Sequence, residues 1–265
     1  ADSPFVPAKS YEYGKKMAIV GAGPAGLSCA YYLALDGYKV TVFEKQDKLG
    51  GMLTLGIPTF RLEKDVVNAE IDILREMGVE FKTGVEVGKD LSLNDLRNQG
   101  FKAIYLAIGA QGGRKLGIEG EDSEGVIAGV EFLRNVNLGR EAKLSGKVVV
   151  IGGGNVAIDV ARTASRQNAE TVSMYCLESA GEMPALPEEI EEARSEDICI
   201  NNGWGPKRIL TENGKVTGVE FKKCVSVFEN GKFSPKYDEN ESIIVPADYV
   251  LLSVGQSIEW GGLLS

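Results

Sequence analysis

The sequence predicts an α/β fold made of two similar units, because one glycine-rich motif occurs twice in the same local context. The segment Gly21–Gly26 (GAGPAG) follows the apolar strand Met17–Val20, and an apolar helix comes next. The segment Gly152–Ala157 (GGGNVA) follows the apolar strand Val148–Ile151 in the same way. In such a turn the first glycine permits a tight bend, the second lets a pyrophosphate approach, and the third small residue packs helix against strand. Together they predict two Rossmann-like dinucleotide-binding domains.

Composition and charge exclude several function classes. The 265 residues are 43% hydrophobic and 25% charged, as in ordinary globular proteins. The net charge of −9 disfavours nucleic acid or an anionic membrane as a partner. No apolar run approaches the roughly 18 residues of a membrane span, and no secretion signal opens the sequence. We therefore expect a cytoplasmic protein with no membrane or nucleic-acid partner.

Histidine is missing from the sequence, and the four cysteines are scattered. Without histidine the chain has no Ser-His-Asp or Cys-His site and no imidazole-ligated metal. Cys29, Cys176, Cys199 and Cys224 form no C-x-x-C pair, so a redox dithiol and a local iron–sulfur motif lack support. Hydride transfer between two bound rings depends on their orientation and needs no side-chain base. The sequence accordingly predicts no catalytic side chain and no metal site.

The first unit begins after a linker, residues 1–15, and its second strand ends at an acidic residue. Strand Met17–Val20 and helix Ala25–Leu35 are followed by strand Lys39–Phe43 and then by Glu44. In this fold an acidic residue at that point binds the ribose of adenosine, although a solvated glutamate is the simpler alternative. Because FMN has no such ribose, the motif together with Glu44 predicts FAD rather than FMN.

The remaining segments continue the alternation of strands and helices and then change to hairpins. The loop Lys48–Pro58 is rich in glycine and apolar residues, and we expect it to cover a flat apolar surface or to be buried. Asn213-Gly214 and Asn230-Gly231 are hairpin turn signals. The further helices expected span residues 64–77, 92–98, 129–138, 155–167 and 187–194. The further strands expected span residues 79–82, 102–107, 147–151, 170–176, 198–201, 207–210, 216–227 and 249–254.

Two strands end in glycine in a similar way, and this predicts how the domains are connected. Ile104–Gly109 and Tyr249–Gly255 each deliver a glycine at the end of an apolar strand. We expect the chain to cross between the domains near these two points. The predicted first domain is residues 16–112 with 246–265, incomplete at its C-terminus, and residues 113–245 form an inserted domain. In this layout residues 246–265 add a strand to the first domain.

Four segments together resemble the small (beta) subunit of bacterial glutamate synthase: Gly21–Leu27, Gly50–Leu62, Gly152–Asn155 and Glu182–Ala185. Relatives of that family are electron-bifurcating ferredoxin–NAD(P) oxidoreductases and the N-terminal part of dihydropyrimidine dehydrogenase. The resemblance implies a pyridine nucleotide-disulfide oxidoreductase-like fold, with FAD on the first unit and an NAD(P) domain inserted into the FAD domain. It implies an enzyme that transfers a hydride between NAD(P)H and FAD. It also implies electron exchange with an iron–sulfur domain or subunit, such as a glutamate synthase large subunit or a ferredoxin.

The motifs and the resemblance also indicate which residues hold the cofactors. In the first domain the candidate cofactor-binding residues are Gly21, Gly23, Pro24, Ala25, Gly26, Glu44, Lys45, Gly51, Met52, Leu53, Ile57, Arg61, Val87, Ala107, Ile108 and Gly109. In the second domain they are Gly152, Gly154, Asn155, Val156, Asp159, Cys176 and Glu178, with Gly255 and Gln256 near the junction. Trp204 and Trp260 are instead expected to be packing or interface residues.

Two features of the family have no counterpart in this sequence. Family members usually carry an N-terminal domain with two iron–sulfur clusters, and they end with a Gly-Asp motif and a helix that hold the flavin. This sequence stops at Ser265, before such a motif. We therefore expect a piece of a longer polypeptide, in which FAD is weakly held or absent.

The choice between NAD and NADP is predicted from the internal repeat. Aligning the two units places Cys176 where Glu44 stands in the first. NADPH-using relatives carry two arginines at this place, and an arginine pair would hold the 2′-phosphate through charge-assisted hydrogen bonds. Their absence favours NAD(H), with Glu178 accepting a hydrogen bond from the free 2′-hydroxyl. The alternative is that Glu178 faces solvent and that Arg162 or Arg166 binds the phosphate.

Three other functions are considered for the same motifs. A nucleotide-binding or assembly module would hold NAD(P) and dock a partner without turnover by itself. A flavin monooxygenase shares both glycine motifs. A dithiol reductase such as thioredoxin reductase is disfavoured, because the sequence lacks the cysteine pair.

Overall fold

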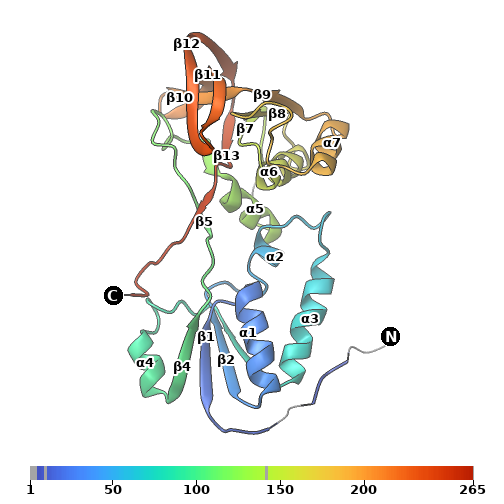
Figure 1. The fold of residues 1–265 in the computed structure, drawn as a ribbon, viewed down its shortest axis with the longest axis vertical. Helices are drawn as coiled ribbons and strands as arrows, with labels where there is room; N and C mark the ends of the chain where they lie inside the picture. The colour runs from blue at the N-terminus through green and yellow to red at the C-terminus, as the bar shows by residue number, and fades with distance from the viewer. Residues whose placement is uncertain (1–4, 9–10, 141–142, 265) are drawn as a thin grey trace. The chain divides into compact units, whose positions relative to one another are not determined.

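The computed structural model describes residues 5–8, 11–140 and 143–264, and the chain divides into two compact units. The first unit comprises Ala1–Gln111 and Ile258–Ser265, and the second comprises Gly112–Ser257. Each unit contains its own parallel sheet and its own hydrophobic core (Figure 1).

The first unit is a four-stranded parallel sheet in the order β3-β2-β1-β4. Its strands are β1 (Lys16–Val20), β2 (Lys39–Glu44), β3 (Glu80–Thr83) and β4 (Phe101–Leu106). Its helices are α1 (Pro24–Leu35), α2 (Met52–Leu55), α3 (Lys64–Glu76) and α4 (Leu93–Asn98). Helices α1 and α3 pack on one face through apolar side chains such as Ala30 and Ile71, and Leu96 of α4 belongs to a second apolar cluster. The apolar strands and amphipathic helices expected from the sequence therefore form a sheet with helices packed on it.

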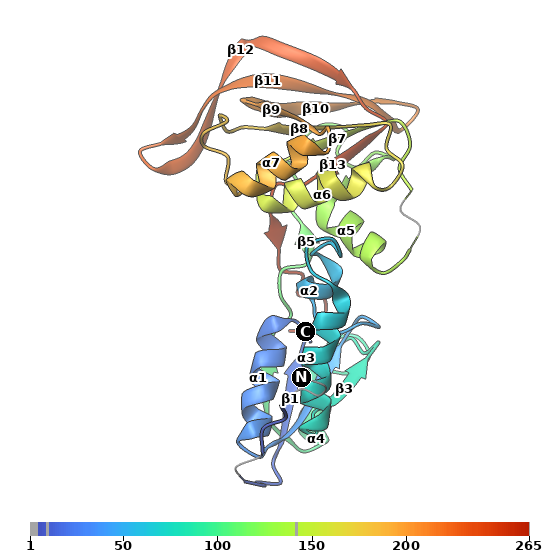
Figure 2. The ribbon, with the colours of Figure 1, turned by 90° about the vertical axis from the view of Figure 1, so that its right-hand side faces the viewer.

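The second unit contains a five-stranded parallel sheet in the order β6-β13-β7-β8-β9. These strands are β6 (Val126–Ala128), β13 (Tyr249–Leu252), β7 (Lys147–Ile151), β8 (Thr171–Cys176) and β9 (Cys199–Asn202). Its helices are α5 (Gly129–Asn137), α6 (Asn155–Ser165) and α7 (Pro187–Ser195). Three antiparallel strands, β10 (Trp204–Glu212), β11 (Lys215–Glu229) and β12 (Lys232–Pro246), lie on the side of the sheet opposite α6 and α7 (Figure 2). Two short segments, β5 (Gly112–Gly113) and β14 (Gln256–Ser257), pair antiparallel.

The predicted layout is wrong for residues 246–257. Strand β13 pairs with β6 and β7, so it belongs to the second unit, and only Ile258–Ser265 returns to the first. Val250 and Leu251 are fully buried, because Leu251 belongs to the apolar cluster shared with α6 and Val250 to the cluster shared with β10 and β11. The sequences Ile104–Gly109 and Tyr249–Gly255 are therefore similar for a reason other than two crossings between the domains. Strand β4 lies beside β1 as β13 lies beside β7, so the similar sequences occupy equivalent places in the two units.

Within the described residues, no helix has the length and apolar character needed to cross a membrane. The same part of the chain contains no cluster of acidic or cysteine side chains arranged to hold a metal ion.

Candidate functional site

Two residues of the first glycine motif, Gly21 and Gly26, lie where only glycine fits. Gly21 has φ +106°, and a Cβ there would lie 2.3 Å from the carbonyl oxygen of Ala107. A Cβ on Gly26 would lie 1.9 Å from the carbonyl oxygen of Gly21, so α1 packs directly on the turn. The Gly21 N–H donates to the Phe43 carbonyl over 2.8 Å. These contacts fix the turn at the carboxyl ends of β1, β2 and β4.

The N-terminus of α1 faces this turn without a side-chain cap among the described residues. Gly23 is the N-cap residue, and Pro24 follows as the first helical residue, where its missing N–H costs nothing. The uncapped N–H groups and the positive end of the helix dipole suit an anion such as a pyrophosphate. The loop at Gly51 lies against the turn, because a Cβ on Gly51 would be 2.6 Å from Cα of Gly23.

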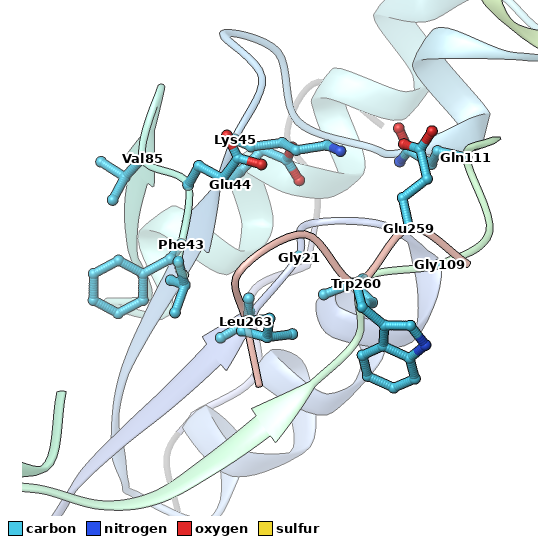
Figure 3. A pocket seen from close by; sticks show the side chains of 14 residues that line it. Gly21, Phe43, Glu44, Lys45, Val85, Gly109, Gln111, Glu259, Trp260 and Leu263 are labelled. Atoms are coloured by element: carbon cyan, nitrogen blue, oxygen red, sulfur yellow. The ribbon is translucent and has the colours of Figure 1, made fainter. Parts of the chain in front are cut away.

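Glu44 lies at the end of β2 and is only 4% exposed, which excludes a solvated glutamate. Its carboxylate accepts hydrogen bonds from the N–H groups of Ala22 and Gln46, each over 2.9 Å. It lines a small pocket of about 60 Å³, together with Gly21, Lys45, Val87, Ile108 and Gly109 (Figure 3). A carboxylate oxygen has more than one acceptor position, so Glu44 can bind the glycine turn and a ribose hydroxyl together.

Other candidates of the first unit lie outside this pocket. Met52, Leu53, Ile57 and Arg61 are absent from its described lining. The ammonium group of Lys64 instead binds the carbonyl oxygens of Leu53 and Ile57, which holds the loop in place.

Three residues near the C-terminus line the same pocket, and sequence reasoning missed them: Glu259, Trp260 and Leu263. Trp260 is 48% exposed, whereas Leu263 is buried in the cluster that contains Val87. Figure 3 shows the Trp260 side chain at the pocket that Gly21 and Glu44 also line. No motif marks this segment, and the expectation that Trp260 is a packing or interface residue overlooked its place at the pocket.

The second glycine motif repeats the main contacts of the first turn. Gly152 has φ +145°, and its N–H donates to the Tyr175 carbonyl over 2.9 Å. A Cβ on Gly152 would lie 2.4 Å from the carbonyl oxygen of Ser253. Gly154 is the N-cap residue of α6, again with no side-chain cap in the described chain. The Asn155 carboxamide oxygen is used structurally, since it accepts from the Leu186 N–H over 2.8 Å.

A cavity of about 620 Å³ opens at the carboxyl ends of β7, β8 and β13. Its lining includes Gly152, Gly154, Cys176, Glu178 and Ser253. The Ser253 hydroxyl oxygen is buried and has no hydrogen-bond partner among the described residues, and it lies toward Gly129 of α5, 2.3 Å from where a Cβ on that glycine would be. The described lining leaves out five candidates of this unit: Asn155, Val156, Asp159, Gly255 and Gln256.

Cys176 ends β8 at the place where Glu44 ends β2, as the alignment of the two units expects. Burial, reinforced by the nearby Glu178, raises the pKa of the Cys176 thiol to about 12. Its sulfur accepts a hydrogen bond from the Asn202 side chain over 3.2 Å. A protonated thiol is only a weak hydrogen-bonding group, so Cys176 cannot replace the acceptor that Glu44 provides.

The charged residues near the second turn fall into two groups. Glu178 lies over the turn, because a Cβ on Gly153 would be 2.8 Å from its Oε2. Arg162 is 7% exposed and donates to Glu192 and Glu196, and Arg166 also donates to Glu196. Both arginines therefore tie α6 to α7, and neither is among the described residues that line the cavity.

Three similar proteins are named as subunits or a small chain of NADP- or NADPH-dependent enzymes. A beta subunit of an NADP(+)-dependent formate dehydrogenase from Moorella thermoacetica is 39% identical, covering 93% of this chain and 35% of that protein. A beta subunit of an NADPH-Fe(3+) oxidoreductase from Geobacter sulfurreducens is 41% identical, covering 91% of this chain and 37% of that protein. The glutamate synthase [NADPH] small chain of Escherichia coli is 37% identical (93% and 56%), which confirms the resemblance seen in the sequence.

Two solved structures share the fold. FprA of Mycobacterium tuberculosis, in complex with NADPH, has a TM-score of 0.79 at 21% identity, covering 92% of this chain and 71% of that one. Thioredoxin reductase of T. acidophilum has a TM-score of 0.68 at 21% identity, covering 94% of this chain and 80% of that one. The chain spans 35–56% of the length of the three curated relatives named above. Residues 15–260 match the family described as pyridine nucleotide-disulphide oxidoreductase, and the chain belongs to this family of oxidoreductases.

Proposed function

We propose that this chain is the nucleotide-binding module of an NAD(P)H-dependent FAD oxidoreductase, with FAD on the first unit and NAD(P)H on the second. The observation that carries the proposal is the repeated glycine turn, in which Gly21 and Gly152 make equivalent contacts at the carboxyl ends of two separate sheets. The names of the relatives, which are NADPH- or NADP-dependent oxidoreductases, support it.

The residues of the first unit fit FAD. The turn at Gly21 and the N-cap at Gly23 leave backbone N–H groups for a pyrophosphate, and Glu44 supplies a buried acceptor for a ribose. Trp260 lines the same pocket. FAD, when bound, accepts a hydride from a nicotinamide and can pass electrons on one at a time.

The residues of the second unit fit a nicotinamide nucleotide and do no chemistry of their own. Gly154 lines the cavity and is the N-cap residue of α6, whose first N–H groups have no side-chain cap among the described residues. Cys176 remains protonated, because its pKa is about 12. The protein therefore contributes binding and orientation, which is what hydride transfer between two cofactors requires.

Within this function, we propose that the second unit prefers NAD(H) to NADP(H). Cys176 provides no positive charge for a 2′-phosphate, and the carboxylate of Glu178 beside it would repel one. Four basic residues line the cavity. Three of them are paired with an acidic side chain, Lys115 with Asp122, Lys207 with Glu220 and Lys222 with Glu239, and the fourth, Arg114, lies against Gly255 after β13, on the side away from Cys176. The relatives named above carry NADP or NADPH in their names, so the preference would distinguish this chain from them.

We also propose that the electrons pass between FAD and iron–sulfur clusters in another domain or subunit, such as a glutamate synthase large subunit or a ferredoxin. The relatives named as beta subunits or a small chain support a multi-subunit setting.

The test is anaerobic reduction of FAD by the purified chain. With FAD added, NADH should bleach the flavin absorbance, and it should do so at lower concentration than NADPH. Binding of both nucleotides without bleaching would favour an assembly module. Consumption of NADPH only with oxygen and an organic substrate would favour a monooxygenase.

A further inference from the structure

The cavity of the second unit is lined by four aromatic residues, Tyr175, Trp204, Phe233 and Tyr237. Three of them have a ring face covered by a neighbour. Tyr175 stacks on Phe221 with ring centroids 4.4 Å apart and an angle of 17°. Tyr175 is only 8% exposed and belongs to the core of the unit, so it offers little ring surface to a ligand.

Two lysines cover two further rings. The ammonium group of Lys223 lies 4.6 Å from the ring centroid of Trp204. The ammonium group of Lys222 lies 4.0 Å from the ring centroid of Tyr237. Cation–π contacts of this kind hold both aromatic side chains in place.

Phe233 differs from these three residues. It lies near the beginning of β12, is 64% exposed, and meets Phe228 edge to face with ring centroids 6.2 Å apart. Most of its apolar surface is therefore open beside the cavity. Pro235 lines the same cavity and lies two residues further along the strand. A flat apolar ligand would remove this surface from water.

One contact of β12 indicates which end of a dinucleotide lies nearer this strand. Strand β7 leads into the glycine turn, with β8 on one side and β13 on the other. The end of β8 is the adenosine side, as the end of β2 is in the first unit. Tyr237 of β12 meets this side, since a Cβ on Gly205 would lie 2.4 Å from Tyr237 Cε1 and 2.8 Å from Leu177 Cδ2. Leu177 directly follows β8.

We propose that Phe233, with Pro235 beside it, is the surface on which the adenine ring of the nicotinamide nucleotide stacks. The inference rests on the proposed function, because it needs a nucleotide in this cavity. It assigns a binding role to the hairpin of β11 and β12. Stacking on an aromatic ring tolerates different bases, so the site should accept hypoxanthine nucleotides nearly as well as adenine nucleotides.

The test measures binding of fragments by calorimetry to the full chain, with excess FAD present to fill the first unit. Phe233→Ala should weaken binding of 5′-AMP and of ADP-ribose roughly fivefold to 100-fold, the usual range for losing one stacked base. Binding of nicotinamide mononucleotide should stay unchanged. Phe233→Tyr, which keeps the ring, should bind as the unmodified chain does. Phe228→Ala is the matched control, because Phe228 is 52% exposed and is absent from the described lining of the cavity.

Each other outcome overturns the inference in a recognisable way. Unchanged AMP binding in Phe233→Ala would refute it while the proposed function stands. Equal losses for AMP and nicotinamide mononucleotide, or an equal loss in Phe228→Ala, would mean that the hairpin acts only on the shape of the cavity. If the unmodified chain binds neither AMP nor ADP-ribose, the assignment of a nucleotide to the second unit fails, and this inference fails with it.

Discussion

The two units repeat one backbone arrangement and differ in the side chain that completes it. In both, the first glycine of the motif donates its N–H to the neighbouring strand, to the Phe43 carbonyl in one and to the Tyr175 carbonyl in the other. In both, a Cβ on that glycine would meet a carbonyl oxygen, at 2.3 Å for Gly21 and at 2.4 Å for Gly152. The part of the site that would face a pyrophosphate is therefore the same in each unit.

The difference lies at the end of the adjacent strand. Glu44 is a buried acceptor that also holds the glycine turn, whereas Cys176 is a buried thiol that stays protonated. We therefore infer that the backbone supplies the phosphate site and that one side chain distinguishes the nucleotides.

The largest effect is expected from the N-cap glycines, Gly23 and Gly154. A Cβ on Gly23 would meet only Cα of Gly51, at 3.8 Å, and a Cβ on Gly154 would meet nothing described within 4 Å. Alanine therefore fits the fold at both positions but occupies space at the proposed pyrophosphate site. Gly23→Ala should weaken FAD binding, and Gly154→Ala should weaken NADH binding, each by about 10- to 100-fold, as for other overpacked sites.

Gly181→Ala is the control, because its Cβ would also meet no described atom within 4 Å and Gly181 lies outside both motifs. The measurement is titration of each variant with both nucleotides. If Gly23→Ala weakened both nucleotides equally, the two sites would not be separate.

A smaller effect is expected at the strand ends. Glu44→Gln keeps the size of the side chain but removes the negative charge of the carboxylate, which accepts hydrogen bonds from the N–H groups of Ala22 and Gln46. FAD binding should fall about tenfold, the equivalent of one charge-assisted hydrogen bond. Cys176→Ser should change NADH binding less than Glu44→Gln changes FAD binding. Equal effects measured by titration would contradict the difference drawn between the two strand ends.

The sequence allowed prediction of those parts of the site that local patterns encode. The turns at Gly21 and Gly152 follow from glycine spacing, and Glu44 follows from the end of an apolar strand. The partner of β13 could not be predicted, because strand pairing is a long-range contact and β4 and β13 have similar sequences. Phe233 was missed for a related reason, since only the packing of β12 brings its ring to the cavity.

The helix layers of the two units provide the third test. Helix α1 packs on α3 through apolar side chains, whereas α6 and α7 share an apolar cluster and are in addition joined by the ion pairs of Arg162 and Arg166 with Glu196. The hydrogen bond from Arg166, with that from Arg162, lowers the pKa of Glu196 from 4.5 to about 2. A lowered pKa stabilises the folded state above about pH 4.5, and this stability is lost as the pH falls from about 4.5 to about 2.

Unfolding of the second unit should therefore require less urea as the pH falls through that range. Glu196→Gln should lower the free energy of unfolding at neutral pH by about 1.5–3 kcal/mol, the range for hydrogen bonds to charged groups. The substitution should also make the free energy of unfolding depend less on pH. The emission of Trp204, measured in a Trp260→Phe background, follows the second unit alone because the chain has 2 tryptophans. The same steep pH dependence in Glu196→Gln would show that another group is responsible.

The smallest expected effect concerns the nucleotide preference of the second unit. Glu178 lines the cavity two residues after Cys176, and its Oε2 lies close to the glycine turn. Its negative charge would repel a 2′-phosphate and accept a hydrogen bond from a 2′-hydroxyl. Glu178→Gln should therefore bring the affinities for NADPH and NADH closer by about threefold to tenfold, the effect of roughly 0.6–1.4 kcal/mol. Arg166→Gln serves as the control, because Arg166 donates to Glu196 and is absent from the described cavity lining. If NADPH binds more tightly than NADH to the unmodified chain and Arg166→Gln abolishes that advantage, the phosphate is held by α6. The strand end at Cys176 would then not decide which nucleotide this unit takes.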